Sequence, residues 1–155
     1  MAFAYADFSL QAPTDASDRI FIYGQGRVYE DVLRLLTEKS SQLKSESDIA
    51  CLIWVIHFAP FDCGHQLLLH EYEKLVRSAT ELGVKTILCG HTHVARAAVE
   101  QGQSIYCGGS AGCIDSEDDA RLQVINIEID DVCSIVRENY VWSAEANEFV
   151  STSVD

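Results

Sequence analysis

The chain has 155 residues, with 11 Lys and Arg against 24 Asp and Glu, and a formal net charge of −13. This length suits one domain, and a hydrophobic content of 48% is enough for a packed core. The acidic balance disfavours nucleic-acid binding through a basic surface, because such binding requires Lys and Arg side chains that neutralise phosphates. It does not exclude an anionic substrate, since a bound divalent cation reverses the local field.

The cysteines and the chain start bear on the compartment. None of the six cysteines forms a C-x-x-C pair, so neither a zinc ribbon nor a thioredoxin-type site is indicated. The opening MAFAYADFSL lacks the basic start and the continuous apolar stretch of a signal peptide. No run approaches the ~18 apolar residues of a membrane span. We therefore expect a cytoplasmic protein that does not act at a membrane.

The first third of the chain predicts little regular structure. Residues 1–49 are expected to form a weakly patterned lead-in with one helix. Within it, RIFIYG at 19–24 reads as a short strand, and apolar residues at helical spacing predict an amphipathic helix over 29–45.

The middle of the chain predicts a strand, a helix and a second strand. ACLIWVI at 50–56 is a continuous apolar run, which is typical of a strand buried on both faces. Apolar residues repeat at helical spacing over 66–82, and Gly83 is the expected stop. VKTILC at 84–89 is the next strand. Such a unit normally makes a parallel strand pair with a right-handed crossover.

The last third predicts antiparallel strands. VARAAVE, QSIYC, RLQVINIEI and CSIVRENYVW are short β-type runs separated by turn residues, which indicates hairpins or a meander. Residues 143–155 are expected to form a carboxyl-terminal tail. The chain as a whole is therefore predicted to be α/β.

Three histidines directly follow the two middle strands. His57 follows the first strand, and His91 and His93 follow the second. Because the carboxyl ends of parallel strands open on one edge of a sheet, we expect the three imidazoles to converge there, with Gly90 allowing a sharp turn. Zinc, manganese and iron accept imidazole readily. The alternative for any one of them is a hydrogen-bonded loop histidine.

These stretches resemble a known family. WVIHFAPFD at 54–62 and VKTILCGHTHVARA at 84–97, with QSIYCGGSAG beyond them, resemble the last two motif blocks of the calcineurin-like metallophosphoesterases. The resemblance covers about residues 50–130. It implies a partial metallophosphoesterase domain over 50–142, forming part of a four-layer α/β/β/α sandwich with mixed sheets.

The resemblance also implies metal ligands. By it, His57 and His91 bind one of two divalent ions, Mn, Fe or Zn, and His93 binds the other. By the same resemblance, the Gly108-Gly109-Ser110 turn is expected to have a structural role. In the complete domain a metal-bound hydroxide would hydrolyse a phosphate ester.

The amino-terminal blocks of the family, D-x-H, G-D-x-x-D and G-N-H, are absent. The chain therefore resembles a domain that lacks its amino-terminal half, whether as a fragment, a truncated gene model or a shortened isoform. Two-metal sites need carboxylates to bridge and neutralise the cations, and three neutral imidazoles cannot do so. We expect the chain alone to be inactive and assign no catalytic residue.

A second hypothesis is a degenerate, non-catalytic module that binds a protein partner. Half of a sandwich would expose the inner face of a sheet, which favours partner binding or self-association. In the loop after the first middle strand, Cys63 and His65 lack a third group for nucleophilic catalysis, so an ordinary loop thiol is expected. Asp62 and His65 could approach a substrate.

Overall fold

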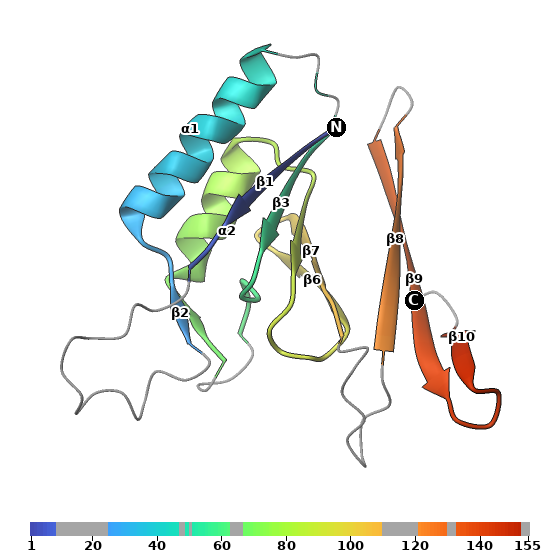
Figure 1. The fold of residues 1–155 in the computed structure, drawn as a ribbon. Helices are drawn as coiled ribbons and strands as arrows, with labels where there is room; N and C mark the ends of the chain where they lie inside the picture. Colours follow the sequence, from blue (N-terminus) through green and yellow to red (C-terminus); the bar gives the residue numbers. More distant parts are fainter. Residues whose placement is uncertain are drawn as a thin grey trace, which may run out of the picture.

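The structure, a computed structural model, forms a mixed α/β fold, as the sequence predicts (Figure 1). It describes residues 1–8, 25–46, 49, 51–62, 67–109, 121–129 and 133–152. The elements in chain order are β1 (Ala2–Ala6), β2 (Gly26–Arg27), α1 (Glu30–Glu46), β3 (Leu52–Ile56), β4 (Leu69–His70), α2 (Tyr72–Glu81), β5 (Thr86–Cys89), β6 (Arg96–Glu100), β7 (Gln103–Cys107), β8 (Arg121–Ile129), β9 (Cys133–Ser143) and β10 (Glu148–Thr152). The strand predicted over 19–24 lies outside the described residues.

Within the described residues, the central sheet has five strands in the order β1-β3-β5-β7-β6. Its first four strands run parallel, and β6 pairs antiparallel with β7. The predicted parallel pairing of β3 with β5 is confirmed, with α2 in the connection between them. The carboxyl ends of the parallel strands therefore open on one edge of the sheet.

Three elements differ from the sequence prediction. Strand β1 lies in the segment predicted to be weakly patterned, and β10 lies in the segment predicted to be a tail. Helix α2 begins at Tyr72, not at residue 66, because β4 pairs with β2 just before it. His70 and Glu71, predicted on that helix, precede it, and Glu71 has a left-handed φ of 62°.

The main core lies between the central sheet and the two helices, which cover the same face of it (Figure 1). Trp54 of β3, Leu75 of α2 and Ile87 of β5 are fully buried there. Each such side chain contributes about 1.5–3 kcal/mol through burial. The Trp54 indole N–H donates a hydrogen bond to Ser40 Oγ of α1 at 3.0 Å, so the only polar atom of Trp54's side chain is satisfied.

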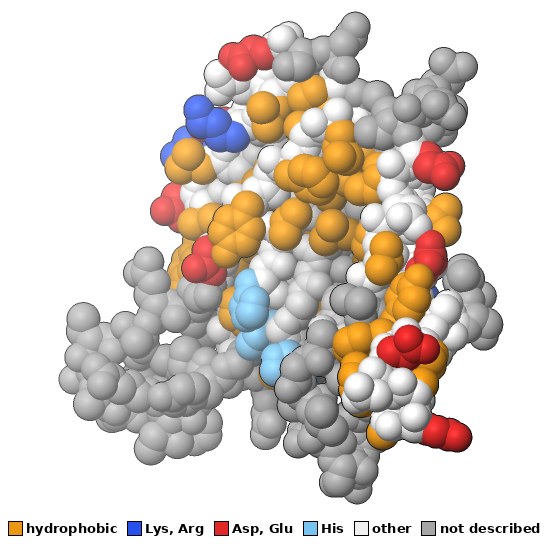
Figure 2. Space-filling model, turned by 45° about the vertical axis from the view of Figure 1, so that its right-hand side comes forward, with side chains coloured by type: hydrophobic (Ala, Val, Ile, Leu, Met, Phe, Trp, Pro, Cys, Tyr) orange, Lys and Arg blue, Asp and Glu red, His pale blue; other side chains and the backbone are white. Residues whose placement is uncertain are grey.

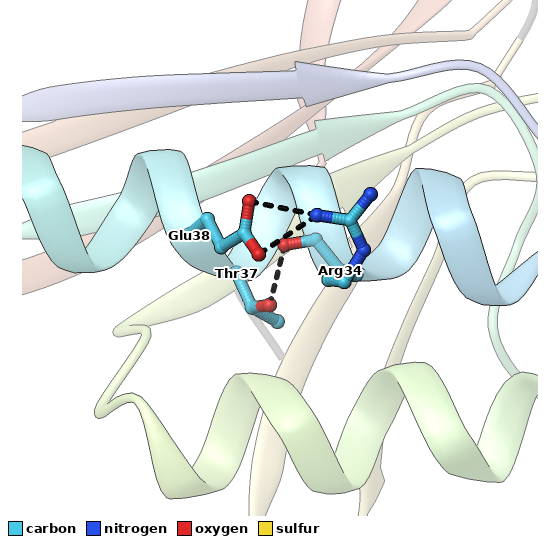
Figure 3. Close-up of polar contacts among 3 residues, drawn as sticks. All are labelled: Arg34, Thr37 and Glu38. Atoms are coloured by element: carbon cyan, nitrogen blue, oxygen red, sulfur yellow. Dashed lines mark hydrogen bonds and ion pairs between the residues drawn. The ribbon is translucent and has the colours of Figure 1, made fainter.

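The other face of α1 is exposed to solvent and carries polar pairs (Figure 3). Arg34 donates from Nη1 to both carboxylate oxygens of Glu38, at 2.8 and 3.0 Å, and the Thr37 hydroxyl donates to the Arg34 carbonyl. Such i, i+4 pairs stabilise a helix weakly. None of the described helices is both long and apolar enough to cross a membrane.

Glycine ends α2 as predicted. Gly83 has a φ of +66°, which glycine adopts without steric cost, and its N–H donates to the Thr80 carbonyl at 3.0 Å. The next N–H, of Val84, donates to the Ala79 carbonyl at 2.9 Å, and the chain turns directly into β5.

The opposite face of the central sheet meets the antiparallel sheet β10-β9-β8 (Figure 1). There Cys51 and Ile53 pack against the partly buried Leu88, Ile127 and Ile135. The described residues therefore form the helix, sheet and sheet layers of the predicted α/β/β/α sandwich.

Strand β1, at the edge of the central sheet, keeps two aromatic side chains in solvent. Phe3 is 52% exposed and Tyr5 is 67% exposed, whereas the alanines that alternate with them face the core. Figure 2 shows hydrophobic side chains gathered on the face that it presents, above the pale-blue histidines.

Candidate metal site

Two loops at the carboxyl edge of the central sheet carry the histidines. His57 directly follows β3, and His91 follows β5 after one residue, Gly90. The Gly90 N–H donates to the His57 carbonyl at 3.0 Å, which ties the two loops together at their starting points. Strand order and this backbone hydrogen bond thus bring the two side chains to one place.

The rings of His57 and His91 touch. His57 Nε2 lies 3.0 Å from His91 Nδ1, and the ring centroids are 4.8 Å apart. One nitrogen donates and the other accepts, depending on the tautomers. The Phe58 ring lies 4.4 Å from the His91 ring and shields one side of the pair.

His93 lies nearby but outside this contact. It is exposed, and no hydrogen bond or ring contact joins it to the pair among the residues that the structure describes. Its charge nevertheless contributes to the lowered pKa of His57. The structure therefore brings two of the three predicted imidazoles into contact and leaves the third at the margin.

His57 is an exposed side chain, but partial desolvation lowers its pKa below the usual value of 6.5, and the neighbouring His91 lowers it further. The carboxylate of Asp7 acts in the opposite direction but does not cancel these effects. His57 is therefore neutral at pH 7, which is the protonation state in which imidazole binds a metal ion.

Asp7 is a residue of this site that the sequence analysis missed. It directly follows β1, so it stands at the same edge of the sheet as His57. A signal was present, because AFAYA alternates as a half-buried strand does and an acidic residue follows it. The rule about strand ends that led to the histidines would have found this carboxylate as well.

The turn that follows Gly90 does not use the conformational freedom of glycine, although the Gly90 carbonyl accepts a hydrogen bond from the Thr92 N–H at 2.9 Å. Gly90 does not have a left-handed backbone, and a Cβ there would meet only the His57 carbonyl oxygen, at 3.9 Å. His91 and His93 have the left-handed φ values instead, 71° and 58°. The left-handed residues of this turn are therefore the two histidines.

Strand β7 supports the loop that carries His91 and His93. The Cys107 thiol donates to the Gly90 carbonyl at 3.2 Å, and its sulfur lies 3.2 Å from the Thr92 hydroxyl. A hydrogen bond from Cys89 is the largest cause that lowers the pKa of Cys107 to about 7. These contacts fix the backbone on both sides of His91.

The turn after β7 also fits a structural role. A Cβ on Gly109 would lie 2.9 Å from the Arg121 Cβ and 3.3 Å from the Ala95 Cβ, so only glycine fits here without displacing its neighbours. Ser110 lies outside the described residues.

The histidine pair fits part of a metal site. Two imidazole nitrogens bound to one tetrahedral zinc ion lie roughly 3.3 Å apart, close to the 3.0 Å between His57 and His91. No group of three or more His, Cys, Asp or Glu side chains among the described residues is arranged to hold a metal ion. Cys63 and His65 lie outside those residues, and Asp62 is exposed. The donor set is thus partial.

Comparisons with known proteins give distant structural matches. No protein-family model matches the sequence, and no curated protein matches it significantly. Among solved structures, wild-type Vps29 from Entamoeba histolytica complexed with zinc is 15% identical, with 98% of each chain covered and a TM-score of 0.36.

Two further solved structures are similarly distant. Vacuolar protein sorting 29 from Cryptosporidium parvum is 12% identical, with 99% of this chain and 97% of that chain covered and a TM-score of 0.34. A predicted phosphoesterase from Streptococcus pneumoniae is 14% identical, with 98% and 97% covered and a TM-score of 0.36. At these scores no residue role passes from those proteins to this chain.

Proposed function

We propose that this chain is a metallophosphoesterase-like module in which His57 and His91 are ligands of one divalent cation. The observation that supports this most is the 3.0 Å contact between His57 Nε2 and His91 Nδ1. The contact lies at the ends of β3 and β5, where the resemblance to phosphoesterases with a G-H-x-H motif implies that two metal ligands meet. His93 is proposed as a ligand of a second cation.

The chain's own residues set the protonation of the site. The neutral His57 offers a lone pair without first losing a proton, and the Gly90 hydrogen bond holds its loop in place. A bound cation would supply Lewis acidity toward a phosphate ester. Asp7 is a carboxylate close enough to affect His57, but one carboxylate cannot neutralise two dications. We therefore propose that the chain alone hydrolyses such esters slowly or not at all.

Metal analysis tests this proposal. Wild-type protein equilibrated with Mn²⁺, Fe²⁺ or Zn²⁺ and then desalted should retain metal, and His91→Ala should retain at least tenfold less. The matched control is His70→Ala, because His70 lies in β4 and is hydrogen-bonded to Gln25 Oε1, just before β2, and not to the histidine pair. Equal metal content in the wild-type protein and in both variants would contradict the proposal.

The partial nature of the site has its own test. The genomic sequence ahead of Met1 should encode, in frame, D-x-H, G-D-x-x-D and G-N-H blocks, and a longer product carrying them should hydrolyse a generic aryl phosphate much faster than this chain. If those blocks are missing, the version of the proposal with a complete two-metal domain fails.

A second candidate function is a non-catalytic module that binds a protein partner. The observation that favours it is the exposure of Phe3 and Tyr5 on the edge strand β1, where backbone groups can pair with another chain. The same surface would also support self-association. Stoichiometric metal together with turnover in this chain would dismiss this candidate. For both candidates we propose the cytoplasm as the compartment.

A further inference from the structure

A cavity of about 200 Å³ lies beside the candidate metal site. Its walls come from the loop that starts at His57 and from the segment that starts at His91. They consist of Phe61, Leu67, Thr92, Val94 and Arg96. Because Thr92 stands between His91 and His93 in the chain, the cavity and the candidate metal site have this loop in common.

One wall carries a fixed positive charge. The guanidinium carbon of Arg96 lies 4.7 Å from the centroid of the Phe61 ring, a cation–π arrangement that orients the planar head of the side chain. No salt bridge is formed by Arg96 within the described parts of the chain. In a chain of net charge −13, a positive charge stacked on an aromatic ring and without a described carboxylate partner is a candidate anion site.

The field of Arg96 also reaches the interior. After the larger effect of the hydrogen bond from Cys89, the Arg96 charge contributes to the lowered pKa of Cys107, which lies under the histidine loop.

Apart from Thr92, the remaining walls are apolar. Phe61, Leu67 and Val94 line them. The volume is comparable to that of a 150 Å³ apolar protein cavity known to bind benzene. Arginine is the side chain best suited to pair with a phosphate through two parallel hydrogen bonds.

We propose that this cavity binds an aryl phosphate monoester with a single ring, the phosphate pairing with Arg96 and the ring lying against Phe61, Leu67 and Val94. The inference rests on the proposed function for its substrate role. The binding itself does not require a metal ion. The proposal narrows the substrate class of the module to phosphate monoesters of small phenols.

Titration of the metal-free protein with phenyl phosphate tests this inference. In chelator-containing buffer, changes in the amide NMR spectrum of the full chain should report saturable binding, weakened about tenfold or more in Arg96→Gln. Arg77→Gln, which removes the same charge from the exposed face of α2, should bind like the wild-type protein. Equal affinities in the two variants would overturn the inference.

Two further measurements locate the ring without relying on a variant. Phenyl phosphate should bind about tenfold more tightly than inorganic phosphate, and its ring protons should give NOEs to Leu67 and Val94 methyl groups. Equal affinity for the two anions, or NOEs only to residues elsewhere, would overturn the inference.

Metal-free buffer separates this inference from the proposed function. The wild-type protein should bind phenyl phosphate when a chelator has removed all metal, whatever the metal analysis shows. If that analysis finds no metal binding, the proposed function fails, while binding of phenyl phosphate can still be demonstrated. Binding that appears only after a divalent cation is added would overturn the inference.

Discussion

The two faces of the central sheet are covered very differently. On one face, α1 and α2 bury a continuous core. Three of its side chains, Trp54, Leu75 and Ile87, are fully buried. On the other face, the described core cluster has only Cys51 and Ile53 as buried members, packed against partly buried side chains of the second sheet. The second sheet leaves the β1 edge uncovered, where Phe3 and Tyr5 remain exposed.

The helix-covered face therefore supplies most of the stability of the fold, and the other face is available for contacts with another chain. The face covered by the helices holds β3 and β5 in parallel register, and this register places His57 and His91 together at the end of the sheet. The face toward the second sheet adds little buried area at β1 and offers surface for another chain. Substitutions on the two faces should therefore differ in both size and kind.

The largest contrast is expected from a pair of core truncations. Leu75→Ala on the helix-covered face should lower the free energy of unfolding by about 2–5 kcal/mol, because it leaves a cavity in a packed core. Ile127→Ala on the opposite face should cost about 1 kcal/mol, since that side chain is only partly buried. Urea unfolding of both variants measures this, and equal losses would contradict the contrast.

A single hydroxyl within the helix-covered core should have the next largest effect. Ser40→Ala removes the acceptor of the Trp54 indole N–H and leaves that donor buried and unpaired. We expect a loss of about 1–3 kcal/mol in the free energy of unfolding. Ser45→Ala, at an exposed position of the same helix, is the control and should change stability little. Similar values for the two serines would show that the buried hydrogen bond contributes nothing.

The histidine pair should make stability depend on pH. Because the pKa of His57 is lowered on folding, the unfolded chain binds more protons between the folded pKa and 6.5. The contribution of His57 is therefore complete above pH 6.5 and is lost as the pH falls through the folded pKa. In metal-free buffer, the stability difference between the wild-type protein and His57→Gln should shrink on acidification. A difference that does not vary from pH 7.5 to 5 would refute this.

The smallest effect on stability is expected at the uncovered edge. Phe3→Ser with Tyr5→Ser changes two exposed side chains, so the free energy of unfolding should move by no more than about 0.5 kcal/mol per site. Self-association, measured by sedimentation at increasing concentration, should nevertheless decrease. If the wild-type protein and the double variant sediment alike as associated species, this surface is not the contact.

Sequence reasoning worked where patterns are long and local. The apolar run at 50–56 and the helical spacing over 29–45 gave β3 and α1, and their order implied the parallel sheet that brings His57 and His91 together. The predictions that failed concern elements whose formation depends on residues distant in the sequence. Strand β4 has two residues and exists through its pairing with β2, which moved the start of α2 from residue 66 to Tyr72. Asp7 escapes the sequence analysis because the five-residue strand β1 lies in a stretch with a weak pattern.

The left-handed backbone at His91 and His93 has a consequence for protein engineering. A non-glycine residue in this conformation is strained by roughly 1–2 kcal/mol, so glycine at either position would relieve the turn. A screen that rewarded heat resistance alone would accept His93→Gly and discard an imidazole in the same step. Stabilised versions of this protein should therefore be selected with metal retention as a second criterion.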